Sequence, residues 1–349
     1  MKKILLLVGV LALLALAIGS WLLLGSATVF KDQKRYLYIA TAAPTEAAVM
    51  DSLVQNGIIR NAGLFSWVAS RMGYWQQVKP GKYKIERGTG MLSLVRMLRN
   101  GRQEPVNLVI TKLRTPQDFA RLVGRRLETD SAQMMAYLQS DSFRVKRSIS
   151  AAESMAFVLP DTYTYFWNSG PEKIFQKLAD AYRAFWTNER KRKAEAKGFT
   201  PLQISIIASI VDEESNAIEE KDTIASVYMN RLQKGMPLQA DPTVKYALQD
   251  FSLKRIYQKH LAVASPYNTY RNSGLPPGPI CTPQQKTLDA VLDAPATDYL
   301  YFVASPAFNG THVFSATYAQ HQVKAKQYQQ ALNVLMAKQQ AKAVLNNAR

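Results

Sequence analysis

The sequence predicts an α+β protein that begins with one transmembrane helix and continues into folded regions beyond it. Three observations support this fold class. The composition, 47% hydrophobic and 20% charged over 349 residues, is that of a chain with a packed core. An uninterrupted apolar run extends from Ile4 to Leu24. After this run, short alternating strand patterns and longer helical patterns follow one another.

The apolar run has the properties of a membrane anchor. It is about 21 residues long, whereas the apolar core of a signal peptide has only about 7 to 15. Lys2 and Lys3 precede it and Trp21 lies near its far end. The positive-inside rule keeps residues 1–3 in the cytoplasm and places the rest outside, so we expect a single-pass protein of the inner membrane. Small residues at 15–20 leave a cleaved signal as the alternative.

The charge of the chain suggests an anionic partner. The formal net charge is +18, and nucleic acid, anionic lipid and acidic cell-wall polymer would all suit it. The expected location outside the cytoplasm disfavours nucleic acid. The single cysteine, Cys281, allows no intramolecular disulfide.

Residues 27–150 are expected to form an N-terminal region outside the membrane, with charged residues resuming at Lys31, near where the folded part should start. The pattern predicts a strand at 35–39, helical segments up to Gly73, and then a small unit at about 78–110. In this unit a strand, a helix at 91–98 ended by Gly101, and a second strand at 106–110 resemble a LysM-like glycan-binding module. A plain packing role is the alternative.

Residues 151–330 are expected to form the second domain, followed by a helical tail at 331–349. Helical spacing runs from 115 to 138, and an aromatic-rich connection follows at 160–167. Residues 173–197 predict one long, basic, amphipathic helix whose charges face solvent.

One acidic residue of the second domain lies in an unusual position. Thr200 and Pro201 predict a helix start, and Ile207, Val211 and Glu214 then follow on one face at helical spacing. A carboxyl group at the edge of an apolar face is desolvated, so the pKa of Glu214 should rise and leave an acid able to donate a proton near neutral pH. Asp212 and Glu213 are expected to be ordinary surface acids. A helix-end glutamate that simply reaches solvent is the alternative interpretation of Glu214.

Several motifs resemble one family. The segment 208–248, ASIVDEESNAIEEKDTIASVYMNRLQKGMPLQADPTVKYAL, is followed by YNTY at 267–270, GLPPGPI at 274–280, YFV at 301–303 and HVFS at 312–315. In this order the segments are similar to the MltG, or YceG-like, family of endolytic murein transglycosylases. They cover most of residues 200–325. The resemblance implies a mixed α/β catalytic domain of the YceG-like type.

The resemblance also implies roles for particular residues. Glu214 takes the place of the catalytic acid and base. The residues expected to bind substrate are Ser215, Gln239, Asp241, Tyr267, Asn268 and Tyr270. Amides and tyrosines suit a sugar, because they combine directional hydrogen bonds with flat apolar faces.

The chain departs from the family pattern at a few positions. Ala240 replaces the usual Ser or Thr, Asp212-Glu213 replaces a common Glu-Lys pair, and Met155 stands where a Glu is expected. These changes put hydrogen bonds around the site in doubt and leave the acid in place. His312 and His321 lack metal-site spacing, so no metal and no cofactor are expected.

Together these features predict a lytic transglycosylase that cuts the MurNAc–GlcNAc bond of nascent peptidoglycan and leaves 1,6-anhydro-MurNAc ends. A transglycosylase needs one carboxyl group, whereas a hydrolytic glycosidase normally needs two. The alternatives are a lysozyme-like hydrolase that uses Asp241 as the second carboxylate, and a non-catalytic membrane-anchored glycan-binding scaffold. The expected partners are glycan strands and, from the resemblance, peptidoglycan synthases of the penicillin-binding class.

Overall fold

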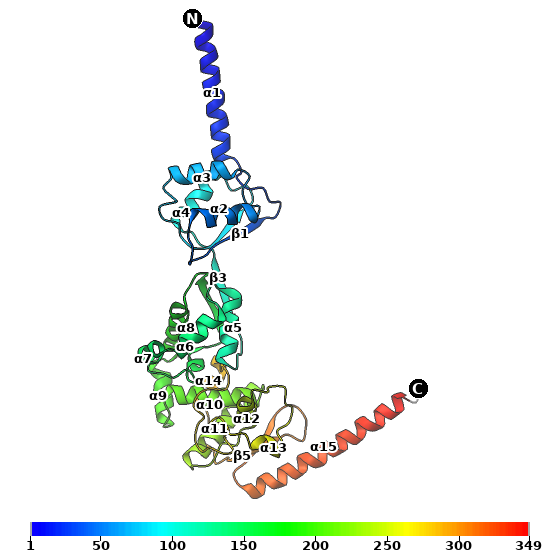
Figure 1. Cartoon of the computed structure of the whole chain (residues 1–349). Helices are drawn as coiled ribbons and strands as arrows, with labels where there is room; N and C mark the ends of the chain where they lie inside the picture. The colour runs from blue at the N-terminus through cyan, green and yellow to red at the C-terminus, as the bar shows by residue number, and fades with distance from the viewer. Residues whose placement is uncertain (1, 348–349) are drawn as a thin grey trace. The chain divides into compact units, whose positions relative to one another are not determined.

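The computed structural model describes residues 2–347, without the side chains of residues 2, 5, 15, 18, 22, 23 and 341–347. It is an α+β fold in which helices predominate and the strands pair in twos (Figure 1). The chain divides into two compact units. The first comprises 1–108, 122–131 and 164–174, and the second comprises 109–121, 132–163 and 175–349. Segments of the two units therefore alternate along the sequence between residues 109 and 174. The sequence pattern had predicted a single domain boundary before residue 151.

The first unit begins with helix α1 (Lys2–Leu24). Among the residues that the structure describes, no helix meets the combined length and apolarity needed to cross a membrane. The apolar run at 4–24 includes side chains outside the described set, and the anchor stays a prediction.

The rest of the first unit packs helices α2 (Glu46–Gln55), α3 (Ala62–Arg71) and α4 (Met91–Asn100) around a two-stranded sheet. Strand β1 (Lys34–Ile39) pairs antiparallel with β2 (Gly81–Glu86), with Leu37 opposite Tyr83. Both of these side chains are buried, as are Ile39 and Ile85, because alternate residues of a strand face the same side. Helix α4 ends at Gly101, which adopts φ of 69° in the left-handed region as predicted.

The strand–helix–strand unit predicted at 78–110 is present as β2, α4 and β3 (Pro105–Ile110), but its two strands do not pair with each other. Strand β2 pairs with β1, and β3 pairs with β4 (Asp161–Phe166). The segment that contains β4 had been interpreted as an aromatic-rich connection. It is a strand because Tyr163 and Tyr165 alternate with exposed residues and are themselves buried.

The second unit is mainly helical. Its helices and short 3₁₀ segments are α5 (Pro116–Arg126, which continues into the first unit), α6 (Ser131–Gln139), α7 (Asp141–Arg147), η1 (Ser154–Phe157), α8 (Pro171–Phe185, which begins in the first unit), α9 (Asn188–Ala196), α10 (Pro201–Glu214), η2 (Ile218–Glu220), α11 (Lys221–Gln233), α12 (Asp241–Leu248), α13 (Gln258–Leu261), α14 (Gln285–Leu292) and α15 (Tyr318–Asn347). The single basic helix predicted at 173–197 is wrong. Thr187 caps a new helix there, since its hydroxyl accepts a hydrogen bond from the Arg190 N–H at 3.3 Å.

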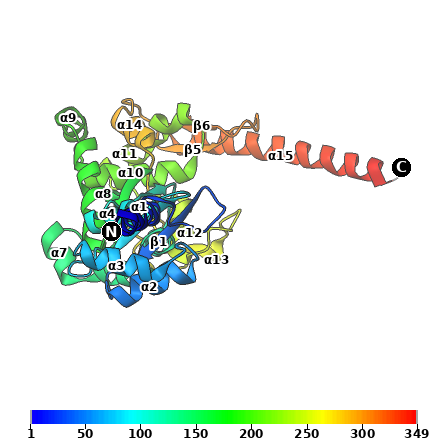
Figure 2. The same cartoon turned by 90° about the horizontal axis from the view of Figure 1, so that it is seen from above.

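The core of the second unit lies where α10, α11 and α14 pack side by side (Figure 2). Helix α10 is buried along most of its length, and its buried residues include Ser205, Ser209 and Asp212 besides aliphatic side chains. Strand β5 (Tyr301–Ala304) pairs with β6 (His312–Ser315), and the start of α15 packs on this hairpin. These elements position the site described next.

Candidate active site

Glu214 is the last residue of α10, and the sequence fixes both ends of that helix. A capping box starts it: the Thr200 hydroxyl accepts from the Gln203 N–H, and the Gln203 side chain accepts from the Thr200 N–H. Pro201 occupies the first turn, where its missing N–H is not needed. The helix ends where Ser215 becomes extended, with φ of −141°. Glu214 therefore lies at the C-terminal end of a helix whose other residues are mostly buried.

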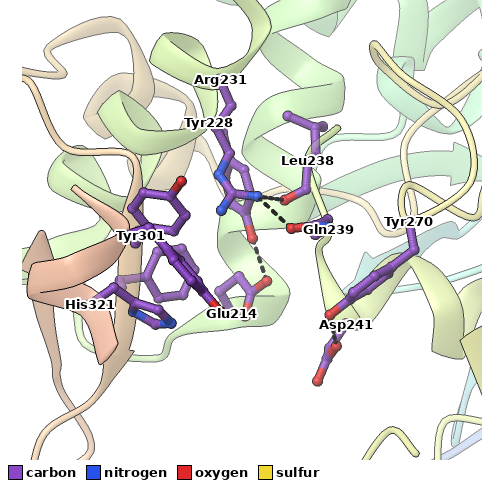
Figure 3. Close-up of a pocket in the computed structure, with 11 residues that line it drawn as sticks. Glu214, Tyr228, Arg231, Leu238, Gln239, Asp241, Tyr270, Tyr301 and His321 are labelled. Carbon is purple, nitrogen blue, oxygen red and sulfur yellow. Dashed lines mark hydrogen bonds between the residues drawn. The ribbon is translucent and has the colours of Figure 1, made fainter. Parts of the chain in front are cut away.

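The Glu214 carboxylate accepts a hydrogen bond of 2.5 Å from the hydroxyl of Tyr228 on α11. The Tyr228 ring is itself buried and meets Phe302 of β5 edge-on, with ring centroids 5.9 Å apart. Packing of α10, α11 and β5 thus fixes the direction of the carboxyl group (Figure 3).

Burial raises the pKa of Glu214 to about 7, and the charge of Asp241 acts in the same direction. The hydrogen bond from Tyr228 opposes this rise because it favours the carboxylate. The expected upward shift is confirmed, so Glu214 can hold and release a proton near neutral pH.

A loop and the start of α12 form a second wall. Asp241 is the first residue of α12, and its carboxylate accepts a hydrogen bond of 2.6 Å from the hydroxyl of Tyr270. Gln239 has a positive φ of 52°, which is uncommon for a residue with a side chain and requires support from its surroundings. Part of this support comes from Arg231, which donates to the carbonyls of Pro237 at 3.1 Å and Leu238 at 2.9 Å.

Aromatic residues from β5 and α15 form a third wall. Tyr301 stacks on His321 with ring centroids 5.4 Å apart, and the guanidinium of Arg231 lies 5.1 Å from the centre of the Tyr301 ring. Burial and the charge of Arg231 lower the pKa of His321, which favours its neutral form. This wall offers flat apolar faces with polar edges.

These walls enclose one pocket of about 320 Å³, which we call the Glu214 pocket. Its lining residues are Glu214, Tyr228, Arg231, Leu238, Gln239, Asp241, Tyr270, Tyr301, Phe302, Tyr318 and His321 (Figure 3). A concave site with aromatic faces, a few converging polar groups and one acid of raised pKa has the features of an enzyme active site.

Four of the residues expected from the sequence line this pocket: Glu214, Gln239, Asp241 and Tyr270. The other three do not. Ser215 is buried and donates to Glu220 at 2.6 Å, while the buried Asn268 amide donates to the carbonyls of Leu261 and Val263 at 2.9 Å each.

Tyr267 belongs to a different pocket, which is treated further below. The structure gives Asn268 and Ser215 supporting contacts within the protein, and their direct binding of substrate stays a prediction.

Asp212 and Glu213 are not the surface acids expected. The Asp212 side chain is fully buried and forms an ion pair with Lys221, and Glu213 pairs with Lys112 at 3.3 Å and with Arg114 at 3.0 Å. The expectation assumed that only one face of α10 is buried. It failed because α11, α14 and the segment at 111–115 together surround this end of the helix.

Tyr228, Arg231, Tyr301 and His321 also line the pocket, and the sequence patterns did not predict them as site residues. Tyr228 and Arg231 lie three residues apart in a helical segment, so they share a face, but nothing local indicates that this face opens into a pocket. Tyr301 begins the YFV motif at 301–303, and His321 has no sequence feature that predicts a place in a pocket. Within the described residues, no group of three or more His, Cys, Asp or Glu is placed to hold a metal ion.

Comparisons with known proteins identify the family to which the chain belongs. The sequence pattern of the YceG-like family matches residues 38–327. An endolytic murein transglycosylase of Bacillus subtilis is 27% identical over 323 residues, which cover 86% of this chain and 87% of the relative. One of Streptococcus pneumoniae is 25% identical, over 78% of this chain and 55% of the relative.

The crystal structure of a yceG-like protein from Listeria monocytogenes superposes with a TM-score of 0.55 and 25% identity. It covers 83% of this chain and 98% of its own. The family match extends over most of the chain and includes every residue of the Glu214 pocket. The chain therefore belongs to the YceG-like family.

Proposed function

We propose that this protein is an endolytic lytic transglycosylase that cuts the MurNAc–GlcNAc bond of peptidoglycan strands with Glu214 as its single acid and base. The observation that supports this most directly is a half-buried carboxyl group whose pKa is raised to about 7, placed in a pocket lined with aromatic and polar side chains. Relatives of the same family in Bacillus subtilis and Streptococcus pneumoniae carry the name endolytic murein transglycosylase.

The proposed reaction needs no water. Glu214 donates its proton to the glycosidic oxygen as the bond from C1 of MurNAc to that oxygen breaks. The resulting carboxylate then takes the proton from the 6-hydroxyl of the same MurNAc while that oxygen bonds to C1. The products are a 1,6-anhydro-MurNAc end and a free GlcNAc hydroxyl, and Glu214 is again protonated. Intramolecular attack supplies the entropic advantage that a second catalytic group would otherwise provide.

The other pocket residues have roles that follow from their chemistry. The rings of Tyr301 and Tyr270 offer faces against which sugar C–H groups can pack, and the Gln239 amide offers both a donor and an acceptor. Tyr228 would stabilise the carboxylate of Glu214 between the two proton transfers, because it already donates a hydrogen bond to it.

Glu214→Gln tests the role of the acid. The amide keeps the shape of the side chain but cannot cycle a proton, so the release of anhydro ends from purified peptidoglycan should fall by about 100-fold or more. The matched control is Glu219→Gln, an exposed acid five residues away, which should retain full activity. Appreciable turnover by Glu214→Gln would remove this residue from the mechanism.

Mass spectrometry of the products separates the proposal from its closest rival. A hydrolase with Asp241 as second carboxylate would leave reducing ends that are heavier by one water than anhydro ends. Asp241 does line the same pocket, so Asp241→Asn adds a second test. If the wild-type protein produced reducing ends and Asp241→Asn did not, the hydrolase would be favoured. If the wild-type protein bound glycan strands but did not cut them, the non-catalytic scaffold would be favoured.

We also propose that the protein works at the outer face of the inner membrane, held there by the apolar run at 4–24. Two observations support this location: Lys2 and Lys3 precede the apolar run, and the chain resembles the YceG-like family. In this location the enzyme would meet strands as synthases of the penicillin-binding class release them. Membrane fractionation of cells tests the location, and recovery of the full chain in the fraction that is not bound to membrane would contradict it.

A further inference from the structure

A second pocket of the same unit takes no part in the chemistry proposed above. It has a volume of about 430 Å³ and is lined by residues that include Gln117, Gln139, Tyr246, Ala247, Gln249 and Tyr267. We call it the Tyr267 pocket. We infer that it is a second glycan-binding subsite, which holds the same strand at a distance from the bond that is cut. This inference rests on the proposed function.

The chemistry of the lining favours an uncharged sugar, which in a peptidoglycan strand is a GlcNAc unit. Among the described residues, the lining contains amides, hydroxyls, aromatic rings and apolar side chains, and no charged side chain. The rings of Tyr246 and Tyr267 lie 4.5 Å apart and tilt by 42°, which gives the wall a broad aromatic surface. Amides can pair with the acetamido groups of N-acetylated sugars, and aromatic faces pack against sugar rings. An anionic ligand would find no cation to balance it here.

A third pocket of the unit provides a contrast. It lies near the face of α11 that points away from the Glu214 pocket. The charged side chains of Lys197, Lys234 and Asp298 line it. The lining of this third pocket is therefore charged, whereas the lining of the Tyr267 pocket is uncharged. An uncharged lining with tyrosines therefore distinguishes the Tyr267 pocket from this third pocket.

Two elements connect the Tyr267 pocket to the Glu214 pocket. Helix α12 begins with Asp241 in the Glu214 pocket and carries Tyr246 and Ala247 near its other end. At a rise of 1.5 Å per residue, Ala247 lies about 9 Å further along the helix axis than Asp241. The segment 267–270 has the same arrangement, because Tyr270 faces the Glu214 pocket and Tyr267 the other. A continuous glycan strand could therefore occupy both pockets.

The Tyr267 pocket is preformed. Asn268 holds the segment rigid, since its side-chain oxygen accepts from the Tyr270 N–H at 3.1 Å while its amide binds two carbonyls of the preceding loop. Gly278 packs so closely on Ala152 and Tyr267 that a Cβ atom there would lie 3.2 Å from the Tyr267 hydroxyl and would clash with the Ala152 carbonyl. Little conformational entropy would then be lost when a sugar binds.

Binding of muramyl oligosaccharides of defined length to the full chain tests the inference, with Glu214→Gln present to prevent cleavage. Ala247→Trp fills the Tyr267 pocket with a large ring. It should weaken binding of an octasaccharide by about tenfold while changing that of a disaccharide by less than twofold. The matched control is Ala296→Trp in the third pocket, which should change neither value. In the chain with Glu214 intact, Ala247→Trp should also alter the lengths of the released fragments.

A second variant with a smaller change controls for the possibility that Ala247→Trp misfolds. Gln139→Leu removes an exposed amide from the pocket wall without adding bulk, and it should weaken octasaccharide binding in the same direction. Unchanged octasaccharide affinity and unchanged fragment lengths in both variants would overturn the subsite. A chain with every pocket intact that binds no oligosaccharide and releases no anhydro ends would instead overturn the proposed function, and the subsite with it.

Discussion

At the scale of single residues, the site depends on one carboxyl group and its surroundings. Glu214 lies at the end of a buried helix, so its charged form lacks the solvation it would have in water. Tyr228 offsets part of this penalty with one hydrogen bond. The balance places the pKa near 7, where the same group can serve as acid and as base.

The first prediction concerns the pH dependence of the reaction. Because the acid form of Glu214 starts the proposed reaction, kcat/KM should fall as pH rises through about 7. Tyr228→Phe removes the hydrogen bond that lowers the pKa of Glu214, so this alkaline limb should move to higher pH, by up to about one unit.

The measurement is a pH–rate profile on soluble glycan strands. Tyr257→Phe is the control, because Tyr257 is 57% exposed and lines no part of the Glu214 pocket. A limb that stays in place in Tyr228→Phe, or that moves to lower pH, would contradict the role given to this hydrogen bond.

At the scale of elements, a buried ion pair holds the end of α10 in position. Asp212 bonds Lys221 at the start of α11 and accepts from the Thr287 hydroxyl of α14 at 2.7 Å. Burial alone would raise the pKa of Asp212, but the hydrogen bonds from Lys221 and Thr287 and the charge of Lys112 keep it below its ordinary value. Three helices thus meet at a charged side chain two residues from Glu214.

The second prediction is that Asp212→Asn lowers the free energy of unfolding by about 3–5 kcal/mol, because it leaves the Lys221 ammonium buried without its counter-charge. Adding Lys221→Met should restore part of this loss, since no buried charge then stays unpaired. Urea unfolding curves measure both effects.

The control is Asp180→Asn, which breaks an exposed ion pair with Arg183 and should change stability by about 1 kcal/mol or less. If Asp212→Asn behaved like this surface variant, the ion pair would not be the contact that fixes the end of α10.

At the scale of the whole molecule, the N-terminal apolar run and the folded part should be separable. The structure corrects the expected starting point of the folded part, near Lys31. Ala27 and Phe30 are 3% and 6% exposed and belong to the core of the first unit. The Ala27 N–H also donates to the Thr89 carbonyl at 2.9 Å. The folded part therefore begins at about residue 25.

The third prediction follows from this boundary. A truncated chain of residues 25–349 should fold and release anhydro ends from isolated peptidoglycan at a rate close to that of the full chain. A chain of residues 31–349 should be less stable by roughly 2–3 kcal/mol, because it loses the buried Phe30 side chain. Thermal unfolding and product analysis of both chains provide the comparison. A folded but inactive 25–349 chain would mean that the N-terminal segment helps to build the active enzyme.

The sequence by itself determined the local features of this protein. The N-cap of α10 at Thr200, the helix stop at Gly101, strands β1 and β2, and the raised pKa of Glu214 all follow from patterns within a few residues. Such patterns are readable because backbone hydrogen bonds and side-chain spacing act over one or two turns. The helix break at Thr187 was not predicted, because residues 188–196 are rich in strong helix formers and so continue the helical signal of residues 171–185, although they lack its amphipathic pattern.

Only the tertiary structure decided which residues meet. Tyr228, Tyr301 and His321 come from three different elements and converge on Glu214 through packing that no local pattern encodes. The same packing buries Asp212. The prediction that Asp212 lies at the surface assumed that only one face of α10 is buried. It also divides the segment 267–270 between two pockets. Burial depends on every element that surrounds a side chain, and spacing along one helix reports only one of them.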